Sequence, residues 1–234
     1  MKEALKLLIL AAVLGNSTAS IAQQPAGNLN IHLDPKTLSA QAKAEELFSS
    51  QQYRRAHMIY LNDLAPIGDK YAQYMLGYMS LSGLGVDQDQ VVACAWYRLA
   101  AERGGPEEFA EIRDALLGQL DESERARSEQ IYRELRRDYS DIAISMREAL
   151  EEFETMNQVS TGSRLSNDSS AITIVDPRAG STSSVDALVR RAQLRLQGHL
   201  DRIAATLGTD SIDAKHATLA DLEDLEARVR EYLR

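Results

Sequence analysis

A constant spacing relates two stretches of this chain at chemically matched positions. An alanine, a large apolar residue, a tyrosine and a glycine recur 37 residues apart: Ala56, Ile59, Tyr60 and Gly68 correspond to Ala93, Trp96, Tyr97 and Gly105. Self-similarity at such a period is the signature of repeat architectures, in which one supersecondary unit stacks on the next. The alanine lets two helices approach, the large side chain fills the groove opposite, and the glycine permits a tight turn. We therefore expect stacked helix pairs.

The apolar positions around this repeat follow a helical period. Asp34-Pro35 has the form of a cap and first turn, and predicts that a helix begins there. Further helices are expected over about 52–64, 69–82 and from residue 87 or 89 to 101, with glycine and proline between them. Only 6% of the residues are aromatic, and the chain has 13 glycines and 5 prolines, which suits an all-α fold.

The second helix pair carries a specific motif in which small, aromatic, glycine and capping positions occur in order. Its members are Ala72, Leu76, Gly77, Gly83, Gly85, Asp89, Ala93, Trp96, Tyr97, Ala100, Ala101 and Gly104. The motif resembles the Sel1-like repeat, a relative of the tetratricopeptide repeat, in an exported bacterial member of that family. The clear copy spans residues 72–105. The preceding unit looks closer to a tetratricopeptide unit, and residues 107–137 resemble a degenerate closing unit, so the resemblance implies a short α-α solenoid over 35–157.

The N-terminus has the pattern of a secretory signal peptide. A charged opening is followed by the apolar run Leu7 to Leu14, and Ser20 and Ala22 supply the small residues that signal peptidase favours. We expect cleavage after Ala22, which removes residues 1–22 and leaves a polar lead-in over 23–34. The apolar run is about half of the roughly 20 residues that a membrane span needs. A periplasmic or secreted protein with no integral membrane span in its mature form is expected.

The C-terminal third differs in character. Residues 158–184 are rich in serine, threonine and glycine, which predicts a flexible linker with a short strand at 171–175. Residues 185–234 carry two apolar stripes that predict a helical hairpin with a coiled-coil-like seam. Two helices alone rarely bury enough apolar surface, so the repeat stack or a second copy is expected to cover them. The arginines of this segment either form surface ion pairs or dock on the acidic helix before the linker or on an anionic partner: Arg190, Arg191, Arg195 and Arg202.

No catalytic constellation is found in the sequence. None of the four histidines has a zinc-ligand spacing, and the glycines at 83 and 85 are explained by the repeat turn. Cys94 is expected to be a buried structural thiol. The carboxylates of Glu148, Glu151, Glu152 and Glu154 form a charge run that is typical of a solvated helix face. No enzyme activity, metal or cofactor is therefore expected.

Recognition of another protein remains the expected function. The net charge of −9 argues against nucleic-acid binding. In a curved helical stack the first helix of each pair lines a surface open to a peptide. The candidate contact residues on the middle pair are Tyr71, Tyr74, Tyr78 and Met79, with Gln73 beside them. The resemblance implies a protein-binding adaptor or scaffold, here of the bacterial envelope. The alternatives are a peptidoglycan-associated factor and a structural homo-oligomer assembled through residues 185–234.

Overall fold

A computed structural model describes residues 35–102, 106–162, 173–176 and 181–234 of the chain. The expected signal peptide (1–22), the lead-in (23–34), Gly104, Gly105 and parts of the expected linker (163–172 and 177–180) lie outside the described residues. The chain divides into two compact units, Met1–Ser140 and Asp141–Arg234. Each unit is described by itself.

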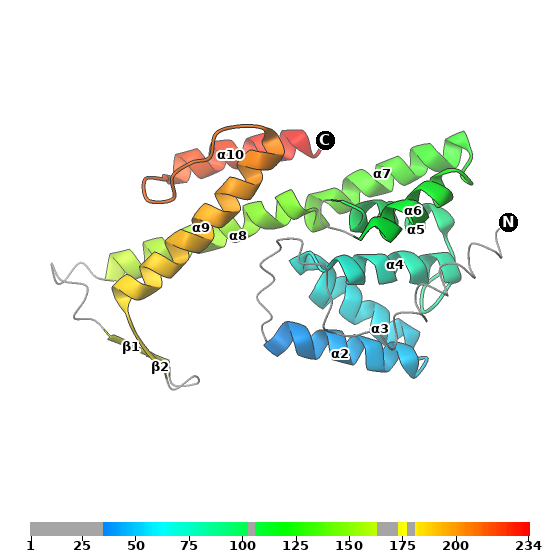
Figure 1. Ribbon diagram of the computed structural model, residues 1–234, viewed down its shortest axis with the longest axis horizontal. Helices are drawn as coiled ribbons and strands as arrows, with labels where there is room; N and C mark the ends of the chain where they lie inside the picture. Colours follow the sequence, from blue (N-terminus) through cyan, green and yellow to red (C-terminus); the bar gives the residue numbers. More distant parts are fainter. Residues whose placement is uncertain (1–34, 103–105, 163–172, 177–180) are drawn as a thin grey trace. The chain divides into compact units, whose positions relative to one another are not determined.

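The first unit is a stack of helices, as the repeat predicts (Figure 1). α2 (Pro35–Ser49) packs against α3 (Tyr53–Ile59), which continues as one π-helical turn, η1 (Tyr60–Leu64), and a 3₁₀ turn, η2 (Ala65–Ile67). α4 (Lys70–Ser82) packs against α5 (Gln90–Ala100). Both α6 (Glu107–Leu117) and α7 (Glu122–Tyr139) then pack against α5. The expectation of an all-α stack of helix pairs is confirmed.

The turn between α4 and α5 explains why the motif needs glycine and aspartate there. Gly83 ends α4 with a φ of +69°, which a residue without a Cβ adopts at little cost. Gly85 has a φ of +77°, and a Cβ on it would lie 2.6 Å from the backbone nitrogen of Arg54. Asp89 caps α5, because its Oδ1 accepts hydrogen bonds from the backbone N–H groups of Val91 and Val92.

The small residues of the motif lie where helices approach closely. A Cβ on Gly77 would lie 3.2 Å from the ring of Tyr97, which is tighter than an ordinary contact, so a larger residue there would require the ring to shift by a few tenths of an ångström. The motif residues buried in the core of this unit are Ala72, Leu76, Ala93, Trp96, Tyr97 and Ala100, while Ala101 is half-buried. Two matched pairs of the 37-residue repeat are equally buried, Ala56 with Ala93 and Tyr60 with Tyr97, whereas Ile59 is half-buried and its counterpart Trp96 is buried.

The second unit contains three helices and one short β-ribbon. α8 (Asp141–Gly162), α9 (Val185–Leu207) and α10 (Leu219–Tyr232) share one apolar core. β1 (Thr173–Asp176) pairs antiparallel with β2 (Ser181–Ser184), with Thr173 opposite Ser184. The sequence indicated a strand only near β1. β2 consists of serine and threonine, and its pairing depends on backbone hydrogen bonds that leave no apolar signal.

The role of α8 differs from the sequence-based expectation. The repeat domain was expected to reach residue 157, but the division between units falls at Ser140, before α8. Ile142, Met146 and Phe153 of α8 pack in the core with Leu196 and Leu200 of α9, and the residues of α10 in the same core are Leu222, Leu225, Val229 and Leu233. The apolar stripes of the C-terminal hairpin are therefore covered within the chain, and they do not require a second copy.

The acidic face of α8 differs in part from the expectation of an outward-facing charge run: Glu151 and Glu154 are exposed as expected, whereas Glu148 and Glu152 face α9. The Glu152 carboxylate forms a bidentate pair with the Arg195 guanidinium of α9. Glu148 Oε2 lies 3.1 Å from His199 Nδ1, also on α9. Arg195 thus docks on the acidic helix before the linker, one of the two roles expected for it, because opposite charges on facing helices reduce the cost of burying each.

Candidate functional site

The structure corrects three of the four partner-contact candidates. Tyr74 is 3% exposed, and Tyr78 and Met79 are also buried, so these side chains cannot present contact area to a partner. The reason is that α4 is surrounded by its neighbours on almost every side. Gln73, named beside them, is buried as well, and its Nε2 donates to the carbonyl oxygen of Tyr139 (3.0 Å).

Tyr71 is the candidate that the structure leaves accessible. It lies in the first turn of α4 and is 40% exposed. Its ring is stacked against that of Tyr74, with centroids 6.3 Å apart and planes 20° apart. Burial of the hydroxyl, together with the nearby carboxylates of Glu45 and Asp69, raises the pKa of Tyr71 to about 12. The phenol is therefore neutral and offers a flat, partly open ring.

Two carboxylates lie beside this ring. Asp69 caps α4, since its Oδ1 accepts from the backbone N–H of Ala72 (2.9 Å). Its Oδ2 accepts from Nε2 of Gln41 on α2 (2.7 Å), a contact that joins the first helices of two successive pairs. Glu45 lies one turn after Gln41 on the same face of α2. Burial and the proximity of Asp69 raise the pKa of the Glu45 carboxyl above its usual range. We call Gln41, Glu45, Asp69 and Tyr71 the α2–α4 surface.

A buried hydroxyl lies behind the α2–α4 surface. Tyr60 opens η1, the segment that packs against both α2 and α4, and the residue is 1% exposed. Among the residues that the structure describes, its hydroxyl has no hydrogen-bond partner. Burial and the nearby Tyr71, Glu45 and Asp69 raise its pKa well above the usual value. An unpartnered buried hydroxyl is costly and calls for an explanation.

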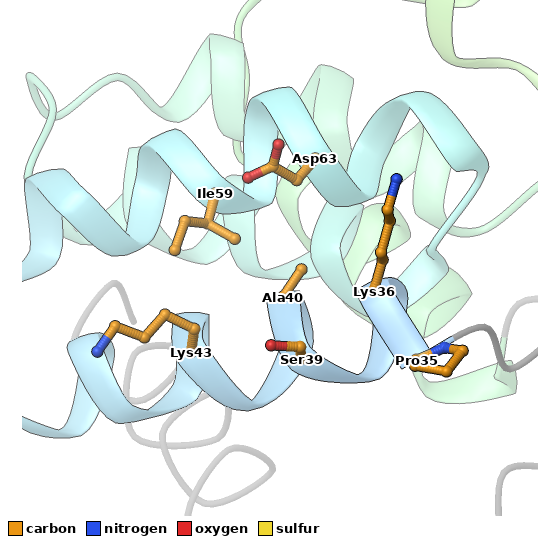
Figure 2. Close-up of a pocket in the computed structure, with 7 residues that line it drawn as sticks. All are labelled: Pro35, Lys36, Ser39, Ala40, Lys43, Ile59 and Asp63. Carbon is orange, nitrogen blue, oxygen red and sulfur yellow. The ribbon is translucent and has the colours of Figure 1, made fainter. Parts of the chain in front are cut away.

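The opposite edge of α2 borders a shallow depression against α3 and η1. Figure 2 shows Ala40 and Ile59 pointing toward each other across it, with Lys36, Lys43 and Asp63 around them. Lys43 pairs with Glu46 of its own helix (2.9 Å). The polar groups around this depression do not converge on one point, as they do in sites that orient a small ligand.

A charged cluster holds α7 against α5. The Arg98 guanidinium lies 4.0 Å from the centre of the Tyr132 ring and pairs with Glu129 (2.6 Å). The Tyr132 hydroxyl donates to Glu102 (2.8 Å), which also pairs with Arg136. These ion pairs link side chains of α7 with Arg98 of α5 and with Glu102, which follows α5. Arg133 of α7 also pairs with Glu129 (3.0 Å), and the cluster fastens the last helix of the unit to α5.

The remaining reactive side chains do not form a constellation in the described part of the chain. Cys94 is fully buried, and its burial raises the pKa of the thiol, as expected of a structural cysteine. His57 and His216 lie in different units, and His32 lies outside the described residues. Within the described ranges, no three metal-ligating side chains come together, and no helix is long and apolar enough to cross a bilayer.

Comparison with known proteins identifies the repeat. Residues 70–105, which comprise α4, the glycine turn and α5, match the model of the Sel1 repeat. This repeat generally mediates protein–protein interactions and is typically a non-catalytic module. No curated protein and no solved structure matches the chain.

Proposed function

We propose that this protein is a non-enzymatic adaptor or scaffold of the bacterial cell envelope that binds another protein or peptide through its helical repeat surface. The observation that carries the proposal is the Sel1 repeat at residues 70–105, folded as a helix pair whose first helix keeps Tyr71 open. Tyrosine contributes large contact area at low conformational cost, which is why it is frequent in interfaces. The binding face is assigned to the α2–α4 surface.

The envelope location is supported by the N-terminal sequence. Lys2, the apolar run from Leu7 to Leu14, and the small residues Ser20 and Ala22 form the pattern of a cleavable export signal. The mature chain would begin at Gln23. Mass spectrometry of the protein isolated from a bacterial periplasmic fraction tests this directly. Recovery of uncleaved chain in the cytoplasm would contradict the envelope location. It would not test the binding role, which the next experiment addresses.

The binding role is tested by site-specific crosslinking in the cell. Leu38 lies on α2 three residues before Gln41, on the face of the α2–α4 surface, and is 42% exposed. Met58 on α3 is a matched control, because it is also apolar and is 53% exposed. A photo-reactive amino acid is placed at one position or the other in the full chain. We expect a discrete adduct from position 38 and none from position 58.

Two outcomes would oppose the proposal. Equal adduct patterns from both positions would mean that the contacts are non-specific. Absence of protein adducts, together with co-sedimentation of the pure protein with peptidoglycan, would favour a wall-associated factor.

A further inference from the structure

One stripe of side chains on α9 faces away from the core of the second unit. Its members are spaced by four, four and three residues, which puts them on one side of the helix: Arg190, Leu194, Gly198 and Asp201. Leu196 packs in the core and lies about 200° round the helix from Leu194, so the stripe is on the opposite side of α9. Leu194 is 75% exposed, the highest value among the large apolar side chains of the described residues. We call these four residues the outer stripe.

Gly198 of the outer stripe is not explained by packing within the described chain. It lies in the interior of a 23-residue helix, where glycine is less favourable than any residue except proline. Apart from the helix backbone, a Cβ on it would come within 4 Å only of Nη1 of Arg202, at 3.8 Å, which is an ordinary contact. A Cβ on Gly77 of α4, by contrast, would lie 3.2 Å from the ring of Tyr97. The missing Cβ of Gly198 therefore serves no contact described within the chain, and it allows a helix from outside to approach α9 closely.

The two charged residues of the outer stripe have no oppositely charged partner among the residues that the structure describes. Arg190 is exposed and forms no ion pair with a described carboxylate. Asp201 accepts hydrogen bonds from the neutral side chains of Gln197 (2.8 Å) and Ser211 (2.6 Å). Because Arg190 and Asp201 are three helical turns apart, the stripe has a positive end and a negative end.

The outer stripe is complementary to a second copy of itself that runs in the opposite direction. With a two-fold axis level with Leu196, Leu194 of one copy lies level with Gly198 of the other. Arg190 then lies within one residue, about 1.5 Å along the helix axis, of the level of Asp201 in the second copy. Each contact occurs twice, as an isologous interface requires. A parallel arrangement would instead place like charges side by side, so the charges favour the antiparallel one.

We propose that the protein forms a homodimer in which the outer stripes of two α9 helices pack antiparallel. Leu194 of each copy packs over Gly198 of the other, and Arg190 pairs with Asp201 of the other. A second copy is the favoured occupant, because one stripe supplies both members of every contact. The proposal rests on α9 and goes beyond the binding role of the repeat. A dimer carries two repeat surfaces, which strengthens the binding of a partner that has two matching segments.

Self-association is measured by sedimentation equilibrium of the chain from Gln23 onward. The concentration runs from about 5 μM to about 1 mM, because a contact between single helix faces is small and associates weakly. We expect a monomer–dimer equilibrium within this range. A chain that stays monomeric throughout would overturn the proposal.

Two substitutions test the contact between Leu194 and Gly198. Leu194→Gln removes the apolar side chain, and Gly198→Gln fills the space that it enters. Each should weaken the dimer at least about ten-fold, since the contact occurs twice. Gly198→Gln should also raise the thermal midpoint of the monomer, because glutamine favours a helix more than glycine does. Leu219→Gln on α10 is the matched control, since Leu219 is 54% exposed, and equal weakening in this variant would reject the stripe.

A charge exchange tests the antiparallel pairing. Arg190→Asp and Asp201→Arg, each alone, place like charges opposite each other at both ends of the interface, so neither variant should self-associate where the wild type does. An equimolar mixture of the two variants restores both opposite-charge pairs. We expect heterodimers with an affinity within about five-fold of that of the wild type. Circular dichroism confirms that both variants are folded, and failure of the mixture to associate would overturn the pairing.

The same experiments distinguish other occupants of the outer stripe. If every variant dimerises as the wild type does, the copies meet through another surface and the proposal is wrong. If the chain is monomeric and a photo-reactive residue at position 194 gives an adduct with a different protein in the cell, the stripe binds that protein and the proposal is likewise wrong. The crosslinking experiment at position 38 reports on the repeat alone, so neither result decides the proposed function.

Discussion

Tyr74 of α4 stacks on Phe109 of α6, with ring centroids 4.5 Å apart and ring planes 18° apart. Tyr97 of α5 contacts the Tyr74 ring edge-on, at a centroid distance of 5.3 Å. One phenol ring therefore joins three helices of the repeat unit. This is the physical reason that Tyr74 belongs to the core, whereas Tyr71, three residues earlier, stays open to solvent.

Truncating this ring should destabilise the first unit strongly. Tyr74→Ala removes a buried aromatic side chain and leaves a cavity among three helices, so we expect the free energy of unfolding to fall by about 3 to 5 kcal/mol. Urea denaturation followed by circular dichroism measures the loss. Tyr71→Ala is the control and should lose less than half as much, since its ring is partly exposed. Similar losses for both would contradict the assignment of Tyr74 to the core.

Gly85 should tolerate substitution far less well than another left-handed glycine. A Cβ at Gly85 would lie 2.6 Å from the backbone nitrogen of Arg54, and the φ of +77° adds strain. We expect Gly85→Ala to cost at least about 3 kcal/mol, from left-handed strain plus the steric clash. Gly208 has a φ of +69° but no atom within 4 Å of such a Cβ, so Gly208→Ala should cost only about 1 to 2 kcal/mol.

Thermal or urea unfolding of the two glycine variants checks this contrast. Because strain from the left-handed conformation is common to both, the difference between them isolates the close approach of the turn to α3. Equal destabilisation would mean that the turn moves away from Arg54 at little cost.

The repeat region was predictable because its signals are local. The interval relating Ala56 to Ala93, the capping position at Asp89 and the turn glycines lie within two adjacent repeat units. These signals predict the helix order and the chemistry of the turns. Gly77 is a similar case. The sequence places it in the motif, and its close approach to the ring of Tyr97 is the physical reason that a glycine occupies this position.

Long-range packing was not predictable from the same signals. Tyr74 and Tyr71 have the same chemistry and differ only in what α5 and α6 place beside them. The bond from Gln41 to Asp69 joins residues 28 positions apart, and no periodicity marks it. The apolar stripe of α8 continues the helical pattern of the repeats, so the sequence could not show that Met146 belongs to the second core.

His199 should titrate well below an ordinary histidine. Burial between α8 and α9, and the nearby Arg202, lower the pKa of its imidazole to about 4. Arg202 Nη2 lies 2.5 Å from His199 Nδ1 and donates to it, because a guanidinium is always protonated. We expect nuclear magnetic resonance titration of the ring protons to give a midpoint near pH 4. A midpoint near 6.5 would show that the ring is exposed in solution.

The same shift has a consequence for stability. Between pH 6.5 and about 4 the unfolded chain binds a proton at His199 that the folded chain does not. Stability should therefore decrease as the pH falls through this window, by up to about 1.4 kcal/mol per pH unit. Burial raises the pKa of the neighbouring Glu148, which acts in the opposite direction. The pH dependence of the free energy of unfolding is measured for the wild type and for His199→Gln. Contributions from groups that titrate alike in both proteins cancel in the difference, which leaves the contribution of His199.

The loop between α9 and α10 should depend on one amide side chain, that of Gln197. Its Nε2 donates to Asp201 Oδ1 (2.8 Å) and to the carbonyl oxygen of Ile212 (3.1 Å), and its Oε1 accepts from the backbone N–H of Ala214 (2.8 Å). Gln197→Ala leaves backbone groups of the loop without partners. We expect a loss of about 1 to 3 kcal/mol and faster amide hydrogen exchange at Ala214. Gln193→Ala, one turn earlier on α9, should leave exchange at Ala214 unchanged, and an equal effect there would mean that the loop responds to any truncation of the helix.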